Sequence, residues 1–492
     1  MIFMPNDIIK KFQDVKLLLN NNAFAEIKAN NDTDYFINEL IEYIEENEKN
    51  QFIVTTDTIR NYQQHERERI HESIIENPKT KEIRENQETP YEILLDVTNK
   101  SYTDGDIKDL NKYFNNRFEK LKKIIQENPE YNKVEDLKNT KTNIDNLHVI
   151  GIVNSINNTK NGHKIIEIED TTGIGSVIVL KDNEDLLESS QTIVKDEVIG
   201  VTGSTNGSLI RADEIAHPGI QRRIIDKQMD FSAVFISDVH IGSKQFDEKA
   251  FNRFIKWLNG NYGSEEQQDL ANDVKYLIIG GDLVDGIGVY PNQEKELKIK
   301  DIYDQYEEAG RLLGDVTDIP IIISPGNHDA TRLAEPQPAL TEKYAKDLCK
   351  QKNVEMVSNP SMIKLDNINV QVYHGRSFDD IVMALNGYTH ADTDKIMKLL
   401  VEKRHLAPIY GERTPLASEF EDYMVMDEIP DILHTGHVHI NSHVNYKGIH
   451  MLNSGTFQKQ TEFQKIYNIV PTYGQVPVIK RGTMQLLDFT ND

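Results

Sequence analysis

The sequence contains a single cysteine, Cys349, among 492 residues. One cysteine can form neither an internal disulfide nor a cysteine-based zinc site, which favours a reducing cytoplasm as the location. No run of ~18 apolar residues is present, so we expect no transmembrane helix and no membrane partner. The N-terminus has no basic start followed by an apolar stretch, so we expect no signal peptide.

Positive charge is also scarce. The chain has 55 Lys and Arg against 80 Asp and Glu, a formal net charge of −25. This balance is unusual for a protein that binds nucleic acid by itself, because the phosphate backbone attracts a basic surface. Either the substrate is not a polyanion, or a partner supplies the basic surface.

What is present suits a multidomain protein. Apolar residues make up 38% of the chain and charged residues 27%, which is typical of a folded soluble protein. At ~150 residues per domain, the length suggests about three domains.

The N-terminal part is predicted to be helical, with a break. Apolar residues recur near helical period within residues 1–61, which predicts a small helical domain; they are Ile8, Ile9, Phe12, Val15, Phe36, Leu40, Ile41 and Ile44. Residues 62–92 are charged and poor in aromatics, which favours a linker, with an exposed helix as the alternative. Residues 93–146 are predicted to be a helical segment that leads into the next domain, with an apolar side made of Leu110, Tyr113, Phe114, Phe118 and Leu121.

Residues 147–218 change to short alternating strands. Five such segments, separated by Asn, Gly and Asp turns, predict a small β-barrel of the OB type; they read HVIGIVNSI, KIIEIEDTT, GSVIVL, EVIGVTGST and SLIRADEIAH. That fold can hold single strands by stacking bases on aromatic rings. Residues 148–218 contain no Phe, Tyr or Trp. A structural or docking barrel is therefore favoured over one that reads nucleic acid.

Residues 228–492 are predicted to form a layered α/β domain. Buried-looking strands alternate there with helical stretches; the strand candidates are AVFIS, KYLIIG, IPIIIS, NVQVY and DILHTG. A polar cluster follows each of these strands, and chemistry-bearing side chains gather where strands end. The clusters contain Asp238 and His240, Asp282, Asn327 with His328 and Asp329, His374, and His437 with His439. Five strand ends in one sheet can converge on one pocket.

The residue types in these clusters fit a two-metal centre. Carboxylate, amide and imidazole groups bind divalent ions of the manganese, iron or zinc kind. Two ions ~4 Å apart can hold a phosphate and activate a bridging water. Asp282 is the natural bridging carboxylate. The one-residue spacer in DVH and HVH suits a strand, where residues i and i+2 point the same way. Each cluster alone is weak evidence, but five in this order are specific.

The set DVH, GGD, GNHD, H and GHVH resembles the calcineurin-like metallophosphoesterase superfamily. Further segments resemble the small subunit of archaeal family D DNA polymerase over about residues 93–492. These segments are HIGSKQF, GGDLVDGIGVYP, PGNHDATR, VYHGRSFDD, RHLAPIYGERTPL, PDILHTGHVH, VNSINNTKNGHKIIEIEDTTG and NIVPTYGQVPVI. The implied fold is multidomain α+β: a helical N-terminal domain, an OB-type barrel and a calcineurin-like phosphoesterase domain.

The resemblance also implies a role for each site residue. One metal would be held by Asp238, His240, Asp282 and His439, and the second by Asp282, Asn327, His374 and His437. His328 would contact the scissile phosphate and act as an acid, since an imidazole can donate a proton near neutral pH. Asp329 is expected to orient the His328 ring, with a turn cap as the alternative. Arg376, Arg404 and Arg413 are expected to hold DNA phosphates, with surface ion pairs as the alternative.

The function implied is proofreading by a 3′–5′ exonuclease subunit, with two metal ions that we expect to be Mn²⁺; Fe and Zn stay open. Its partners would be a large catalytic polymerase subunit and the 3′ end of a DNA primer. Two alternatives are a non-catalytic scaffold and a phosphoesterase acting on small phosphodiesters. The retained ligands favour the active form over the scaffold, since the related small subunits of eukaryotic replicative polymerases resemble it but have lost metal ligands. A large subunit that supplies the basic surface would also explain the acidic chain.

Overall fold

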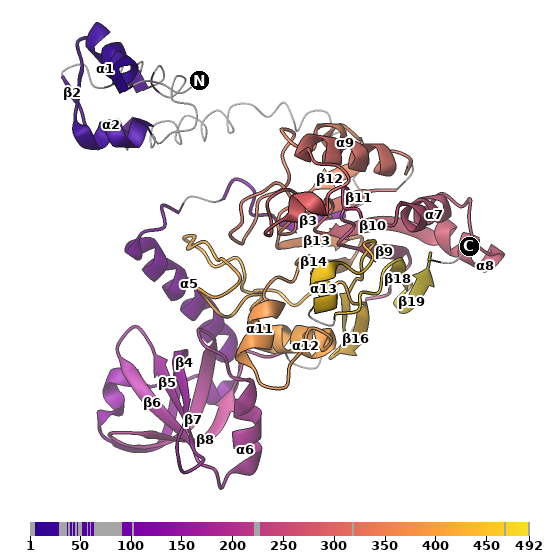
Figure 1. Cartoon of the computed structure of the whole chain (residues 1–492). Coiled ribbons are helices and arrows are strands. Elements are labelled where there is room, and N and C mark those ends of the chain that lie inside the picture. The colour runs from indigo at the N-terminus through magenta and orange to yellow at the C-terminus, as the bar shows by residue number, and fades with distance from the viewer. Residues whose placement is uncertain are drawn as a thin grey trace. The chain divides into compact units, whose positions relative to one another are not determined.

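A computed structural model describes residues 5–28, part of 37–62, and residues 91–100, 103–220, 227–316, 319–466 and 469–490. The chain divides into two compact units, Met1–Thr89 and Pro90–Asp492. Together they confirm the expected mixed α+β class (Figure 1). None of the described helices combines the length and hydrophobicity needed to cross a bilayer.

The first unit is built from short helices and a two-stranded parallel sheet. Its elements include α1 (Pro5–Asp14), β1 (Leu18–Leu19), α2 (Asn21–Lys28) and β2 (Ile53–Val54). Ile8, Phe12, Leu40 and Ile44 are buried together, in agreement with the helical spacing. Phe36 and residues 63–90, most of the expected linker, lie outside the described residues.

The second unit contains a closed five-stranded barrel in the order β4-β5-β6-β8-β7. Its strands are β4 (Asn143–Asn158), β5 (Lys164–Glu169), β6 (Ile174–Val179), β7 (Val198–Asn206) and β8 (Ile210–Ala216), with α6 (Glu184–Ser189) between β6 and β7. Alternate aliphatic residues of these strands fill the interior, because successive side chains of a strand point to opposite faces.

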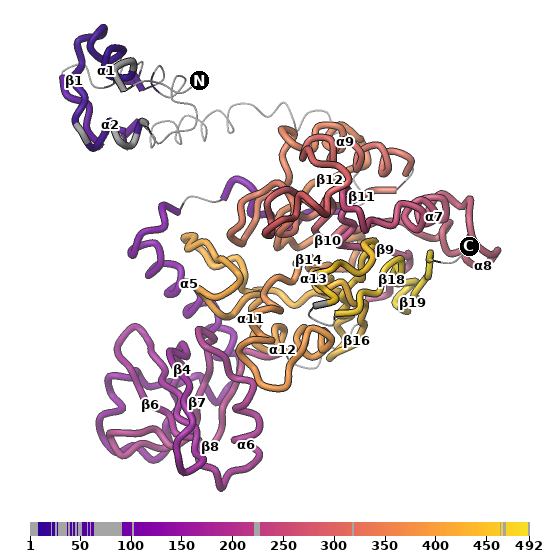
Figure 2. Tube along the Cα trace, viewed as in Figure 1, coloured from indigo at the N-terminus to yellow at the C-terminus, as the bar shows by residue number. Residues whose placement is uncertain are grey.

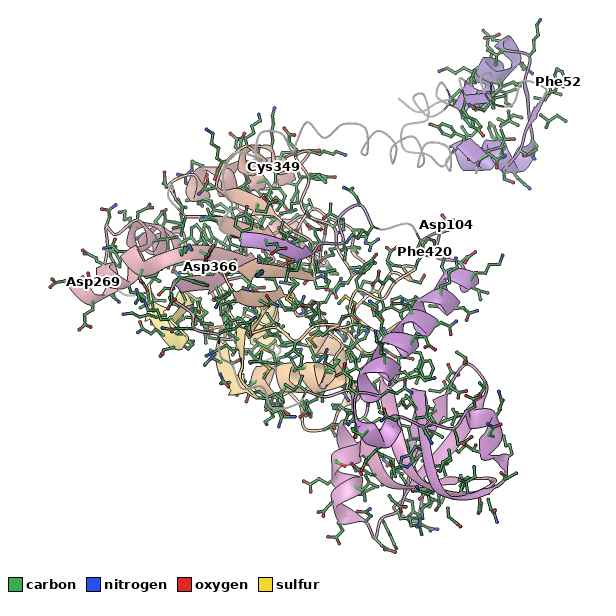
Figure 3. All side chains as sticks on the ribbon, turned by 180° about the vertical axis from the view of Figure 1, so that it is seen from behind. Phe52, Asp104, Asp269, Cys349, Asp366 and Phe420 are labelled. Carbon is green, nitrogen blue, oxygen red and sulfur yellow. The ribbon has the colours of Figure 1, made fainter. Side chains whose placement is uncertain are left out.

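Helix α5 (Ile107–Ile125) connects the barrel to the rest of the second unit. Asp106 caps its first turn by accepting from the Asp109 amide. Arg117 is fully buried; its Nε donates to Asp422 Oδ2 at 2.7 Å, and its Nη1 donates to the carbonyls of Asp196 and Pro408. One side chain thus joins the helix, the barrel and the loop that precedes β15. Phe420 of this loop, labelled in Figure 3, lies under Lys112 with Nζ 4.4 Å from its ring centroid.

The remainder of the second unit is a sandwich of two six-stranded sheets. The first has the order β12-β11-β10-β9-β18-β19, formed by β9 (Ser232–Ile236), β10 (Val274–Gly280), β11 (Ile321–Ser324), β12 (Val354–Met356), β18 (Gln475–Lys480) and β19 (Thr483–Asp488). The second has the order β16-β17-β15-β14-β13-β3, formed by β3 (Tyr91–Leu95), β13 (Ser361–Leu365), β14 (Ile368–Val372), β15 (Ile432–Thr435), β16 (Ser442–Tyr446) and β17 (Ile449–Asn453).

Helices cover both outer faces of the sandwich (Figure 2). The first sheet packs against α7 (Glu248–Leu258), α8 (Glu265–Asp273), α9 (Ile302–Leu313) and α10 (Lys346–Cys349). The second packs against α11 (Phe378–Ala384) and α12 (Thr393–Lys403), and a short α13 (Glu462–Ile466) precedes β18. A separate apolar cluster lies between the two sheets. The central strands, such as β9 and β11, are buried on both faces, which explains their nearly continuous apolar sequence.

Strand β3 departs from the expectation. Residues 91–92 were expected in the linker and 93–95 at the start of a helical segment, but β3 is an edge strand that pairs antiparallel with β13. Its partner lies about 270 positions later in the chain, from Met362 to Leu365. Such pairing depends on tertiary contact, so local sequence patterns do not reveal it.

Candidate metal centre

The five polar clusters lie at the carboxyl ends of five strands, as expected, but these strands come from two sheets. Asp238 and His240 follow β9, Asp282 follows β10, and the GNHD segment follows β11, all in the first sheet. His374 follows β14, and the GHVH segment follows β15, both in the second sheet. The expectation of a single sheet was wrong. The centre lies where the strand ends of the two sheets face each other.

The backbone of the ligand positions is unusual. Five of these positions have φ between 51° and 72°, the left-handed region that residues other than glycine rarely adopt. They are Asp238, His240, Asp282, His437 and His439. The two one-residue spacers therefore do not belong to regular strands, which corrects the sequence interpretation. Backbone in this region costs ~1–3 kcal/mol per residue and clusters at functional sites. Here the left-handed backbone directs alternate side chains of a loop toward the same cluster of ligands.

Neighbouring glycines let the backbone approach the ligands. A Cβ at Gly326 would collide with Asp282 Oδ1, and one at Gly436 would meet Asp238 Oδ2 at 2.6 Å. Gly326 belongs to the GNHD segment and Gly436 to the GHVH segment. Both motifs need glycine, because the Asp282 carboxylate at Gly326, and the Ser237 hydroxyl with the Asp238 carboxylate at Gly436, occupy the space of a side chain.

The first ligand group comprises Asp238, His240 and His439 with Asp282 beside them. His439 Nε2 lies 3.0 Å from His240 Nε2 and 3.4 Å from Asp238 Oδ1, and His240 Nε2 lies 3.9 Å from Asp282 Oδ2. Asp238 Oδ1 is buried and has no hydrogen-bond partner among the described residues. A buried carboxylate oxygen without a donor is costly, and a cation bound between these groups would satisfy it. The residues present fit a divalent metal.

The second ligand group comprises Asp282, Asn327 and His374. His374 Nε2 lies 3.3 Å from Asp282 Oδ2 and 3.1 Å from Asn327 Oδ1, while its Nδ1 donates to the Gly280 carbonyl. The ring centroid of His437 lies 5.3 Å from that of His374. Asp282 is thus adjacent to both groups, the arrangement that a bridging carboxylate needs.

His328 lies beside the centre and is more open than its neighbours. Its Nδ1 is 2.7 Å from the Asp285 carbonyl, and its Nε2 lies 4.0 Å from Asp282 Oδ2. Its side chain is 15% exposed, against 2% for Asp282 and His240. A carbonyl can only accept, so Nδ1 carries a proton and Nε2 is the atom presented to the centre.

Asp329 does not orient the His328 ring, so that expectation was wrong. Its Oδ2 accepts from the Gly326 amide at 2.9 Å and the Leu283 amide at 3.3 Å, and its Oδ1 accepts from the Tyr306 hydroxyl at 3.0 Å. Burial and the nearby Asp282 charge raise the pKa of Asp329 to about 6. Asp329 holds the GNHD turn against the turn after β10, which is the turn-cap alternative.

Three supporting residues escaped the sequence analysis. Asp285 Oδ1 lies 3.0 Å from His240 Nδ1, Asp379 Oδ2 lies 3.4 Å from His437 Nε2, and Gln464 Nε2 lies 2.9 Å from His439 Nδ1. Such partners fix the ring orientation of metal-binding histidines. Asp285 and Asp379 stand inside the segments GGDLVDG and VYHGRSFDD, so those motifs carried a signal. Gln464 carries no signal in the sequence.

The electrostatics of the centre favour charged carboxylates. Burial opposes ionisation of Asp282, but His374 and His328 outweigh it and hold its pKa well below the usual range. Burial likewise opposes protonation of His374, but Asp282 outweighs it and raises the pKa of His374 to about 10. Burial lowers the pKa of His240. Ionised carboxylates and a neutral His240 are the states that bind metal, and a bound metal would displace the proton of His374.

The three arginines differ from one another. Arg404 is buried, and its guanidinium donates to the Met426 and Asp427 carbonyls, both at 2.7 Å. It has no free face for a phosphate, so the expectation of a DNA contact was wrong for Arg404. Arg376 is half-buried and donates to the Leu333 carbonyl, and Arg413 is exposed.

Comparison with known proteins gives the family. A family model that describes the B subunit of DNA polymerases alpha and epsilon matches residues 233–443. The DNA polymerase II small subunit of Methanothermobacter thermautotrophicus is 51% identical over 492 residues, which cover 99% of this chain and 100% of that protein. The DNA polymerase II small subunit of Archaeoglobus fulgidus is 44% identical over 393 residues, covering 79% of this chain and 78% of that protein.

Among solved structures, an archaeal phosphodiesterase is 11% identical with a TM-score of 0.24, covering 52% of this chain and 99% of that one. The sequence relatives decide the assignment, since the match to the first of them extends over nearly the whole of both chains. The chain belongs to the family of archaeal DNA polymerase II (family D) small subunits.

Proposed function

We propose that this small subunit is a two-metal phosphodiesterase that proofreads DNA as a 3′–5′ exonuclease for its polymerase. The convergence of the ligand groups from both sheets on one buried cluster carries the proposal, together with the unpartnered Asp238 Oδ1. A scaffold has no need to keep a buried carboxylate oxygen without a donor, because that arrangement destabilises a protein without a cation.

In the proposed centre Asp238, His240, Asp282 and His439 hold one ion, and Asp282, Asn327, His374 and His437 hold the other. Two such ions would activate a bridging water and neutralise charge on the phosphate. Oxygen and nitrogen ligands of this mixture suit Mn²⁺, which we expect to support activity best.

His328 is the proposed acid. Because Nδ1 is committed to the Asp285 carbonyl, a neutral ring offers Nε2 as an acceptor, and only the doubly protonated ring can donate from Nε2. In the protonated form His328 would give its Nε2 proton to the leaving oxygen of the scissile phosphate.

The test is degradation of a mismatched primer by the complex of this chain with its large partner, in the presence of Mn²⁺. A primer labelled at its 5′ end should shorten stepwise from the mismatched 3′ end. His328→Ala should lower the rate by about 10²–10⁴-fold while the metal content is retained. Unchanged degradation by this variant would remove His328 from the reaction.

The same assay separates the alternatives. A scaffold would leave every primer intact, whereas a small-molecule phosphoesterase would hydrolyse bis(4-nitrophenyl) phosphate without shortening DNA. We also propose that the barrel is of the OB type and docks protein rather than bases, since residues 148–218 contain no aromatic side chain.

A further inference from the structure

Two of the most exposed large apolar side chains in the described part of the second unit belong to segments that follow residues of the metal centre in the sequence. Leu333 is 65% exposed and Met383 is 62% exposed. Isolated exposed apolar side chains need no explanation, but neighbouring ones beside a polar site indicate contact with a ligand.

Both side chains belong to one surface with Arg376 and Arg413. Arg376 Nη1 donates to the Leu333 carbonyl at 3.0 Å, and Arg413 Nε lies 2.7 Å from Met383 Sδ. A parallel bridge between Glu335 and Leu416 sets the segment of Leu333 alongside that of Arg413. We call Leu333, Arg376, Met383 and Arg413 the rim patch.

The rim patch borders the second ligand group. Arg376 follows His374 by two residues, and Leu333 follows the GNHD segment by four. Met383 lies on α11, one turn after Asp379, whose carboxylate contacts His437. The segments of Arg376, Met383 and Leu333 therefore carry, or closely follow, a residue of the metal centre, and Arg413 joins them through its contact with Met383.

The two arginines of the rim patch are not held by close ion pairs. Burial raises the pKa of Glu335 to about 7 and the charge of Arg376 opposes this rise, so Arg376 is partly offset, whereas Arg413 is exposed. Among the described residues, neither Arg376 nor Arg413 forms a salt bridge with a carboxylate within 4.0 Å. Asp380 of α11 is buried, and its carboxylate accepts from the backbone amides of Arg413 and Thr414. Two guanidinium groups beside two apolar side chains match a phosphate chain that carries flat apolar bases.

We propose that the rim patch binds the unpaired nucleotides of single-stranded DNA next to the scissile phosphate. Leu333 and Met383 would contact base faces, and Arg376 and Arg413 would contact phosphates. A base in a duplex has its faces covered by its stacked neighbours, whereas a frayed or mismatched end exposes them. The rim patch would thus select unpaired ends. This inference rests on the proposed exonuclease function.

The experiment compares patch variants with matched controls in the complex with the large subunit and Mn²⁺. The variants are Leu333→Ala with Met383→Ala, and Arg376→Gln with Arg413→Gln. The controls are Ile107→Ala, an 80% exposed apolar residue of α5, and Arg311→Gln, an exposed arginine of α9. The substrates are an unpaired oligothymidylate 3′ end, a fully paired primer and bis(4-nitrophenyl) phosphate, which fills the metal centre but offers no second nucleotide.

Both patch variants should raise KM for the unpaired end by about three- to tenfold relative to their controls. The apolar pair should raise it more for the unpaired than for the paired end. An unchanged KM, or an equal rise on both ends, would overturn the proposal. So would an equal loss on the small diester, because the variant would then have disturbed the metal centre.

A failure of the proposed function is distinguishable from a failure of the rim patch. If the wild-type complex cleaves neither DNA nor the small diester, the exonuclease proposal fails. Fluorescence anisotropy of a labelled oligothymidylate then decides the rim patch: a higher Kd in both patch variants than in the controls supports it, and equal Kd values overturn it.

Discussion

At the scale of single residues, Asp285 has two contacts in the candidate centre. Its carboxylate lies 3.0 Å from His240 Nδ1, and its carbonyl accepts from His328 Nδ1. Gln293 and Gln458 donate to the same carboxylate and hold it in place. One residue thereby sets the orientation of a metal ligand and of the proposed acid.

Replacing this carboxylate should weaken the metal centre. Asp285→Asn should lower metal affinity by about 10–100-fold, because the amide no longer supports the basicity of His240. The measurement is a titration with Mn²⁺ against a competing chelator, and it does not depend on activity. Asp366→Asn is the control, since the Asp366 carboxylate contacts Lys275 and Tyr276 at the surface (Figure 3). Equal affinities in the two variants would assign Asp285 a packing role alone.

For Arg404 we predict a loss of stability without a change in DNA binding. Arg404→Ala should lower the free energy of unfolding by about 1–3 kcal/mol, because the carbonyls of the buried Met426 and of Asp427 lose their donor. KM for DNA should not change. The measurements are denaturant unfolding and primer kinetics on the same preparation. Normal stability with a raised KM would instead restore Arg404 as a DNA contact.

At the scale of elements, α5 and the loop before β15 are joined by a buried ionic network. Asp422 Oδ2 accepts from Arg117 Nε at 2.7 Å and lies 2.9 Å from His405 Nε2, and all three residues are buried. The Ala407 amide donates to His405 Nδ1, so the neutral ring donates to Asp422 from Nε2. Removing one partner of such a network is costly, because it leaves a buried charge unpaired.

This network should make stability depend on pH. Burial, aided by the charge of Arg117, lowers the pKa of His405 from 6.5 to about 4. The unfolded chain therefore takes up a proton before the folded chain does, and stability falls as the pH falls from about 6.5 to about 4. Asp422 acts in the same direction at lower pH, because His405 and Arg117 outweigh the effect of burial and hold its pKa below the usual range.

The comparison that isolates this contribution is His405→Gln, whose amide can still donate to Asp422. Between pH 6.5 and 4 the wild type should lose about 3 kcal/mol more stability than the variant. Unfolding free energies across this pH range measure the difference. Parallel pH curves would show that His405 is not the group responsible.

At the scale of the whole molecule, the net charge of −25 opposes binding to DNA. We expect the isolated chain to bind DNA weakly at physiological salt, and the complex with its large subunit to bind it tightly, since the partner would supply the basic surface. Anisotropy titrations at several salt concentrations test this expectation. Tight binding by the isolated chain that resists added salt would contradict it.

The fold could be predicted in part, because some strands carry a local sequence pattern and others depend on a distant partner. Central strands of the sandwich such as Ile321–Ser324 are runs of mostly aliphatic residues that are buried on both faces, so a local sequence pattern predicts them. Strand β3 was not predicted, because its partner β13 lies far along the chain. For the same reason, local patterns could not assign the strands to two sheets rather than one.

The sequence by itself supplied the candidate donor side chains of the centre. The identities of Asp238, His240, Asp282, Asn327, His374, His437 and His439 depend on donor atoms and on their place after strands, both of which are local properties. Only the tertiary structure decided which of the other residues serve that centre. Arg404 donates to backbone carbonyls, and Asp329 accepts from a backbone amide of a turn. Asp285 contacts His240 through its carboxylate and His328 through its carbonyl. A side chain's partner depends on segments that are distant in sequence, so its role is settled by the packing of the two sheets.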